Sequence, residues 1–422
     1  MIAIDLDDRR HQATARNVIL LVGDGMGQAH RLGGQLLIAG RTGRLAMDRF
    51  PHAGLMGTMS ADPDHFVTDS AAAATALATG HKTANGAVAV DLQTHPLPTI
   101  LELAKRAGKA TGLVTTCQVT DATPAAFGAH VPHRSDQSEI ARQYLTETGI
   151  DVILGGGAAY WYPAGAPTPI APDPAEPREA SQSTAGDLIS LAGERGYAYV
   201  TTAAGLRSEI TRPSRSRLLG LFANQELFRQ RTEGDGDSYD PPVSLAELTD
   251  AAIARLSPDQ DGFFLMVEES AIDRMAHRNN APLTLKGVLE LDRAVSVALA
   301  YAETSPDTLV IVAADHECGG LAIAGSDDPP YPYEPGGGLL DTVMAGEDGP
   351  FPIAGADHGF VMGWATTGHT AAAVPVTATG PGAARLTGFY ENTHLFAVMA
   401  DALGVEELAT RRWGANGSHR DS

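Results

Sequence analysis

The chain has 422 residues, enough for one large α/β domain or two ordinary ones, and its 43% hydrophobic content can build a sizeable core. A formal charge of −21 makes nucleic acid and anionic membrane surfaces poor partners. Its two cysteines, Cys117 and Cys318, give neither a disulfide framework nor a thiolate zinc pattern, and no apolar run approaches the roughly 18 residues of a membrane helix.

The first candidate element is the apolar run 18–22, which stops at Gly23-Asp24-Gly25-Met26-Gly27. A buried strand followed by a glycine-rich turn places Asp24 at the strand's carboxyl end, where open α/β sheets bind ligands. The glycines lack the spacing of a dinucleotide fingerprint. An ordinary turn aspartate is the alternative.

The next informative stretch is 65–80, in which a β-prone run at 66–68 meets Asp69-Ser70 and then a run of Ala and Leu ending at Gly80. Strong helix formers predict a helix that begins at Asp69 or Ser70 and stops at Gly80. Free backbone N–H groups at such an end favour an anion, so the Ser70 hydroxyl could face a phosphate or an acyl oxyanion. Plain N-capping is the alternative.

Strands and helices then alternate, which predicts a large, mostly parallel central β-sheet flanked by helices on both faces. The expected elements are a helix at 98–107, strands at 112–119 and 150–154, a helix at 184–195, strands at 197–201 and 218–222, a helix at 244–256, a strand at 263–267, a helix at 282–303, strands at 309–314 and 374–378, and a helix at 392–403. Two Pro- and Gly-rich segments interrupt them. We expect 158–183 to be a surface excursion and 325–357 a cap-like insertion.

Four of the expected strands end in a carboxylate, and parallel strands bring such residues to one edge of the sheet. These residues are Asp24, Asp121, Glu268 and Asp315. Three histidines, His277, His316 and His369, add nitrogen ligands, which favour zinc over calcium. On a helix, Asp273 and His277 share one face and can grip one ion.

Other polar residues complete the pattern. Asp121 and Thr123 offer hard oxygen ligands suited to Mg²⁺, and Arg134 offers a planar fork for phosphate, although a turn, a cap and a surface arginine are the alternatives. We expect Cys318 not to bind a metal, because hard ligands dominate around it. We expect the same of Asp357-His358, because no buried strand precedes that pair. Two metal ions beside a helix-terminal serine describe phosphoryl transfer through a phosphoserine.

Six ordered motifs make the chain resemble the alkaline phosphatases over about residues 18 to 403. They are Gly23 to Gly27, Thr68-Asp69-Ser70-Ala71-Ala72, Gln118 to Arg134, Val267 to His277, Ala314-Asp315-His316-Glu317 and Thr367-Gly368-His369-Thr370. The resemblance implies a polar segment at 1–17, a single catalytic domain at 18–422, and hydrolysis of small phosphate monoesters with two Zn²⁺ and one Mg²⁺.

The resemblance also implies a role for each matching residue. Ser70 would be the nucleophile and Arg134 the phosphate clamp. One zinc would be held by Asp273, His277 and His369, the other by Asp24, Asp315 and His316, and the magnesium by Asp24, Thr123 and Glu268. Asp121 would support the magnesium through water. Arg274 departs from some relatives, and we expect it either to face solvent or a surface carboxylate, or to act as a second cation beside Arg134.

Other functions stay open at this point. A phosphodiesterase or phosphomutase of the same superfamily would share the metal core, a sulfatase would need a cysteine at the nucleophile position, and a metal-stabilised binding protein would have lost catalysis. The family is often dimeric and usually exported. We therefore expect a homodimer as one arrangement and a periplasmic or secreted location, with the leader absent from this sequence because 1–17 lacks a signal-peptide core; a cytoplasmic location stays open.

Overall fold

The structure, a computed structural model, describes residues 15–174, 176–212, 216–229, 236–326, 347–406 and 408. Its helices and strands are, in chain order, β1 (Asn17–Gly23), α1 (Gln28–Ala39), β2 (His52–Gly57), α2 (Ser70–Thr79), α3 (Ile100–Arg106), β3 (Ala110–Gln118), α4 (Ala122–Gly128), α5 (Gln137–Gln143), β4 (Val152–Gly156), α6 (Leu188–Glu194), β5 (Tyr197–Val200), α7 (Ala203–Ile210), β6 (Arg217–Leu221), α8 (Leu245–Leu256), β7 (Phe263–Glu269), α9 (Ala271–Ala276), α10 (Ala281–Thr304), β8 (Thr308–Ala313), β9 (Glu317–Cys318), β10 (Ala322–Gly325), β11 (Glu347–Pro352), β12 (Gly359–Gly363), β13 (His369–Thr370), β14 (Val374–Thr379), β15 (Gly388–Glu391) and α11 (Thr393–Leu403).

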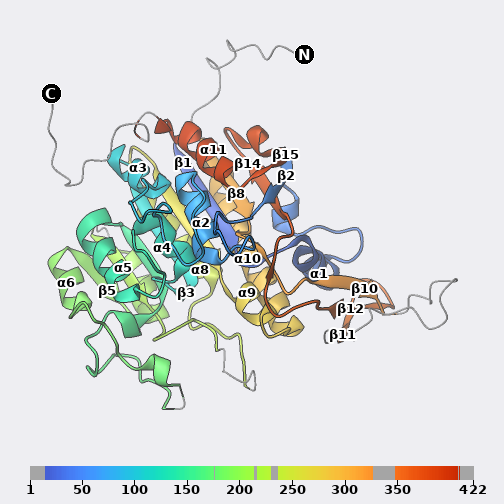
Figure 1. The fold of residues 1–422 in the computed structure, drawn as a ribbon, viewed down its shortest axis with the longest axis horizontal. Coiled ribbons are helices and arrows are strands. Elements are labelled where there is room, and N and C mark those ends of the chain that lie inside the picture. Colours follow the sequence, from blue (N-terminus) through green and yellow to red (C-terminus); the bar gives the residue numbers. More distant parts are fainter. Residues whose placement is uncertain are drawn as a thin grey trace, which may run out of the picture.

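A ten-stranded sheet runs through the molecule in the order β15-β2-β14-β8-β1-β7-β3-β4-β6-β5 (Figure 1). Strand β14 runs antiparallel to both of its neighbours, and the other pairings are parallel. The predicted α/β fold with a mostly parallel sheet is therefore confirmed. The sequence did not predict β2 and β15, because both are short, contain glycine and are partly exposed.

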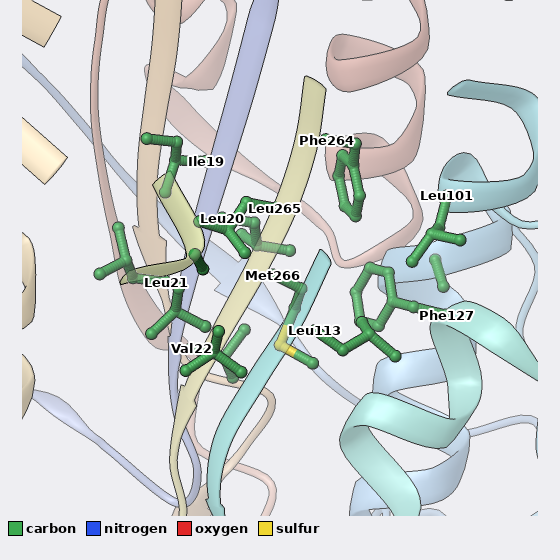
Figure 2. Close-up of a cluster of buried hydrophobic side chains, with 14 of the residues drawn as sticks. Ile19, Leu20, Leu21, Val22, Leu101, Leu113, Phe127, Phe264, Leu265 and Met266 are labelled. Atoms are coloured by element: carbon green, nitrogen blue, oxygen red, sulfur yellow. The ribbon is translucent and has the colours of Figure 1, made fainter. Parts of the chain in front are cut away.

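The middle of the sheet is the core of the protein. All seven residues of β1 are buried because parallel neighbours flank it on both sides and helices cover both faces, which explains its continuous apolar run. In Figure 2 the side chains of Phe264 and Leu113, from β7 and β3, lie beside Phe127 of α4. The rings of Phe127 and Phe264 stack with centroids 5.9 Å apart. Truncating one such side chain to alanine should cost about 3–5 kcal/mol.

Helices cover both faces of this sheet, as predicted. On one face α3 and α4 pack against β3 and β7, and α2 and α11 pack together beside them. On the other face α8 and α10 pack against β3, β7, β1 and β8, and α1 packs on α10. Both layers leave the carboxyl edge of the central strands uncovered by a helix axis, so loops can meet there.

The predicted boundary segments have different outcomes. Of 1–17, only 15–17 lie within the described residues, and Asn17 already opens β1. Apart from residue 175, the helices within the segment 158–183 are two short 3-10 turns, and Pro163 and Ser183 form an isolated bridge. Of the predicted insertion 325–357, residues 327–346 lie outside the described residues. Beside α1, strands β10, β12 and β11 form a small antiparallel sheet (Figure 1). The described ends of the segment 325–357 contribute the last residue of β10 and all of β11 to it.

Among the described residues, no helix is both long enough and apolar enough to cross a membrane.

Candidate active site

Four adjacent strands carry the predicted carboxylates. In the sheet order β8-β1-β7-β3, Ala313, Val22, Glu268 and Thr115 form one row of register partners. Asp315 and Asp24 each follow their row member by two residues, at the same edge. Asp121 follows the end of β3 and precedes α4. The structure therefore gathers all four side chains at the carboxyl edge, in the geometry that the sequence led us to expect.

Ser70 is the first residue of α2, at the end where backbone N–H groups have no helical partner. Asp69 is the N-cap and its Oδ1 accepts a hydrogen bond from Ala72 N at 3.0 Å. The Ser70 side chain is buried, and its Oγ lies 3.2 Å from His316 Nε2. Gly80 ends the helix in the left-handed conformation, as predicted.

The β-prone run before this helix does not form a strand. Residues 66–68 are a loop, and their backbone carbonyls contact Ser60, Asn85 and His369 instead of a neighbouring strand. Asn85 Nδ2 donates to Val67 O at 2.9 Å, and Asn85 Oδ1 accepts from Asp69 N at 3.1 Å. This loop fixes the approach to Ser70. The sequence did not anticipate the hydrogen bonds of Asn85, or that Asp69 also contacts Arg134 at 3.3 Å.

The first ligand cluster joins Asp273 of α9, His277 directly after it, and His369 of β13. His277 Nδ1 contacts Thr367 O at 2.6 Å and His369 Nδ1 contacts Thr68 O at 2.8 Å. Each carbonyl accepts the Nδ1 proton, so both Nε2 atoms point inward, 3.0 Å apart and within 3.4 Å of Asp273.

Those two inward nitrogens test whether a metal ion fits. Without a cation, one ring must carry an additional proton for the nitrogens to share a hydrogen bond. Burial opposes that proton, but Asp273 raises the pKa of His369 to about 9. A zinc ion would replace the proton and be bound by two imidazoles and a carboxylate, which is a normal zinc donor set. The residues present therefore fit the ion.

The second ligand cluster is Asp24, Asp315 and His316, all buried. Asp315 Oδ1 accepts from Gly25 N at 3.1 Å and His316 N at 2.9 Å, which orients the side chain. His316 Nε2 lies 3.2 Å from Asp315 Oδ2, 3.4 Å from Asp24 Oδ1 and 3.2 Å from Ser70 Oγ. One ring nitrogen cannot bond to all three atoms, whereas a cation among them could be bound by all.

The charges of the second cluster also indicate that it can hold a cation. Burial, and then the nearby Asp315, Asp273 and Glu268, raise the pKa of Asp24 well above its ordinary value. Like charges in a dry site need cations to ionise together. Gly25 lets the two clusters approach, because a Cβ there would lie 2.9 Å from Asp273 Oδ1.

Glu268 lies between the second cluster and α4. Burial raises its pKa to about 8, and a hydrogen bond from Thr115 opposes that rise. The Thr115 hydroxyl donates to Glu268 Oε2 at 2.5 Å. Its neighbour Glu269 points elsewhere, where Thr116, Ala271 N and the Tyr239 hydroxyl occupy its two oxygens. Only Glu268 therefore has an oxygen facing the region predicted for magnesium.

A chain of charges links Ser70's helix to α9. Arg134 contacts Asp69 at 3.3 Å and Asp121 at 3.0 Å, and Arg274 contacts the other oxygen of Asp121 at 2.8 Å. Although burial raises it, the two guanidinium groups bring the pKa of Asp121 far below its ordinary value. Arg274 thus does not pair with a surface carboxylate: Asp121 is 10% exposed.

Two residues or pairs that the sequence analysis set aside, Cys318 and Asp357-His358, can be compared with the structure. Cys318 lies within the first cluster, as its fourth possible ligand atom. Burial raises the pKa of its thiol far above the ordinary value, and Sγ lies 3.8 Å from Asp273 O. Asp357 and His358 are exposed and belong to neither cluster.

The site holds a serine nucleophile beside clustered carboxylates and imidazoles, with two guanidinium groups nearby. This arrangement suits transfer of a phosphoryl group, because positioned positive charge stabilises the transition state of that reaction. The fold and the site together define a phosphatase.

Comparison with known proteins gives its family. The model of the alkaline phosphatase family matches residues 15–331, and the chain belongs to this family. It is 34% identical to alkaline phosphatase 4 of Bacillus subtilis, covering 91% of this chain and 88% of that one. It is 37% identical to streptomycin-6-phosphate phosphatase of Streptomyces griseus, covering 94% and 92%. Alkaline phosphatase from the Antarctic bacterium TAB5 superimposes with a TM-score of 0.72 at 30% identity, covering 93% and 99%.

Proposed function

We propose that this phosphatase hydrolyses phosphate monoesters through a phosphoserine on Ser70, at a centre of two Zn²⁺ and one Mg²⁺. Membership of the alkaline phosphatase family supports phosphomonoester hydrolysis. The observation that carries the finer proposal is the contact of Ser70 Oγ with His316 Nε2, because it sets the hydroxyl at the border of a ligand cluster.

The residues divide into three groups, one for each ion that they would hold. Asp273, His277 and His369 would hold one zinc, Asp24, Asp315 and His316 the other, and Asp24, Thr123 and Glu268 the magnesium, with Asp121 behind it. When bound, these ions lower the pKa of the serine hydroxyl and stabilise charge on the attacking and leaving oxygens. A structure of a TAB5 alkaline phosphatase variant has Mg bound in the site called M3, which favours including magnesium here.

The chain's own groups perform the positioning. The guanidinium of Arg134 contacts Asp69, the neighbour of Ser70, and Asp121, and would bind two phosphate oxygens with its planar fork. The Ser70 oxygen attacks phosphorus, the bond to the leaving alcohol breaks, and the alcohol takes a proton. Water then attacks the phosphoserine from the vacated side, which releases inorganic phosphate and restores the hydroxyl.

The test uses purified enzyme with zinc and magnesium. We expect rapid hydrolysis of p-nitrophenyl phosphate, slow or no hydrolysis of its bis-ester, and phosphate on the Ser70 peptide after acid quenching. Faster cleavage of the bis-ester would favour a phosphodiesterase. Label on another residue would move the nucleophile, and inactivity on both esters would favour a binding protein.

The natural monoester, the compartment and the assembly are further expectations. The printed names of relatives range from alkaline phosphatase to streptomycin-6-phosphate phosphatase, so family membership leaves the alcohol undefined. We keep the expectations of a periplasmic or secreted location and of a homodimer, which cell fractionation and sedimentation would test.

A further inference from the structure

The short helix α9 carries three groups of the site, and its own sequence does little to hold it in place. Asp273 and Arg274 lie on it, and His277 comes directly after its last residue. A helix of only six residues is unstable by itself in water. Its N-cap, Ser270, makes no capping hydrogen bond, and Ser270 Oγ is buried without a hydrogen-bond partner among the described residues. Neighbouring elements must therefore fix the position of α9.

The carboxylate of Glu269 takes the place of the missing cap. Its Oε1 accepts a hydrogen bond from Ala271 N, at the first residue of α9, at 3.0 Å. The same oxygen accepts from the Thr116 hydroxyl at 2.8 Å, and Thr116 Oγ1 in turn accepts from Ser270 N at 3.0 Å. Two backbone N–H groups at the start of α9 are thereby tied to strand β3.

The second oxygen of Glu269 is held by Tyr239, whose hydroxyl donates to Oε2 at 2.6 Å. The Tyr239 ring belongs to an apolar cluster whose other members are Phe228, Ala271, Met275 and Leu283. Two of these members lie four residues apart on one face of α9, whereas Asp273 and His277 share another face. Tyr239 therefore supports both the anchor of the helix and the face that does not carry the ligands.

Burial makes these contacts definite. Glu269 is 0% exposed, and its three donors, Thr116, Ala271 N and Tyr239, are neutral groups. Water cannot replace a donor at a buried carboxylate, so each lost hydrogen bond leaves an oxygen unpaired. A carboxylate held in this way resists displacement, and the start of α9 is fixed with it.

We propose that Glu269 is a positioning residue for the first ligand cluster and for Arg274. It acts through the start of α9, which sets Asp273 beside the two imidazoles and Arg274 at 2.8 Å from Asp121. This rests on the proposed metal centre and phosphomonoesterase function. Groups that orient metal ligands typically change metal affinity by about 10–100-fold. The second ligand cluster should not respond, because Asp24 N contacts the backbone oxygen of Glu269 and not its side chain.

The experiment measures the release of zinc from the loaded enzyme to an excess of the chromogenic chelator 4-(2-pyridylazo)resorcinol. In Glu269→Met, which removes both acceptors at similar size, we expect one of the two zinc ions to leave about tenfold faster and the other at the wild-type rate. Glu269→Gln keeps an oxygen for Ala271 N and Thr116, and its amide can donate to the Tyr239 oxygen. It should therefore release zinc at a rate close to that of the wild type.

Tyr239→Phe removes only the hydroxyl and should speed release of the same ion by less than Glu269→Met does. If Glu269→Met does not fold, this variant decides the question. Its matched control is Tyr197→Phe, because Tyr197 is also buried and donates to a backbone oxygen, Ile150 O, at 2.5 Å, at the amino end of β4. The control should lower the melting temperature without changing zinc release.

Two results would overturn the proposal. One is zinc release at the wild-type rate in both Glu269→Met and Tyr239→Phe. The other is equal acceleration of both zinc ions, because that indicates general loosening of the sheet edge and a merely structural role for Glu269.

Failure of the proposed function would look different. Wild-type enzyme that holds two zinc ions but leaves p-nitrophenyl phosphate intact would refute the phosphomonoesterase, and zinc release would still decide the role of Glu269. Wild-type enzyme that holds no zinc would refute the metal centre. Amide hydrogen exchange over residues 270–277 would then decide: it should be faster in Glu269→Met and unchanged in Glu269→Gln, and equal exchange in all three proteins would refute the positioning role.

Discussion

Replacing Arg274 tests how the pair of arginines shares Asp121. Arg274 Nη2 contacts one oxygen of Asp121 at 2.8 Å, and Arg134 contacts the other at 3.0 Å. With Arg274→Ala, Asp121 keeps one partner, and the phosphate site loses a positive charge. Arg134 then carries the full attraction of Asp121, which draws it away from the space beside Ser70. Both effects weaken the binding of phosphate.

The size of the effect follows from burial. A hydrogen bond to a charged group contributes about 1.5–3 kcal/mol. The Arg274 side chain is 27% exposed, so solvent screening reduces this. We expect a loss of about 1–2 kcal/mol, which corresponds to about a five- to thirtyfold rise in the inhibition constant for inorganic phosphate. KM should rise with it, and kcat should stay level or increase if product release limits turnover.

The assay is competitive inhibition by phosphate at one pH and ionic strength, with full zinc and magnesium. Arg278→Ala is the matched control, since Arg278 follows the same helix α9 but is exposed. Arg274→Lys keeps the charge without the planar fork, so its inhibition constant for phosphate should lie between those of the wild type and Arg274→Ala. If wild type and Arg274→Ala give the same inhibition constant, Arg274 has no part in phosphate binding and the reasoning is wrong.

Three further outcomes are expected. Dialysis against EDTA should lower activity and melting temperature together, and zinc with magnesium should restore both; full activity in metal-free protein contradicts the metal assignment. Ser70→Ala should lower kcat at least about a hundredfold while phosphate still binds, which equilibrium dialysis can check; a smaller loss argues against a phosphoserine. Burial lowers the pKa of His130, but Glu102, 3.0 Å away, raises it above 6.5 overall. The ion pair therefore stabilises the fold fully at a pH below the pKa that His130 has in the unfolded chain. This stabilisation disappears as the pH rises through the pKa that His130 has in the folded protein. Melting temperature should therefore fall more steeply as the pH rises above 6.5 in wild type than in His130→Gln, and parallel curves would exclude that linkage.

The sequence predicted the elements that hold the site because local chemistry determines them. The apolar run before Asp24, the alanine-rich helix after Ser70 and the stop at Gly80 each depend on neighbours within one element. The same holds for the spacing of Asp273 and His277. These signals survive in any arrangement of the strands, which is why they could be recognised without the fold.

Contacts between distant segments could not be predicted in this way. The order β8-β1-β7-β3 decides that Asp315, Asp24 and Glu268 are neighbours, and periodicity says nothing about order. The β-prone run at 66–68 is a loop whose carbonyls contact Ser60, Asn85 and His369, and the contact with His369, 301 residues away, could not be predicted from local sequence. Arg274 met Asp121 rather than solvent for the same kind of reason. An aspartate before the helix could have suggested Asp69 as a partner for Arg134.

The order of the strands has a consequence for how the protein matures. Strand β1 comes from the amino-terminal end of the chain, and the strands β3, β7 and β8 of the same sheet come from residues 110 to 313. His369 of β13, which pairs with β9, completes the first ligand cluster. An amino-terminal part of the chain that ends before His369 therefore cannot complete the first ligand cluster, and one that ends before Asp315 lacks two of the three residues of the second. We therefore expect a chain that ends before His369 to bind a metal ion at the first cluster more weakly than the full chain, because it lacks one of the ligands.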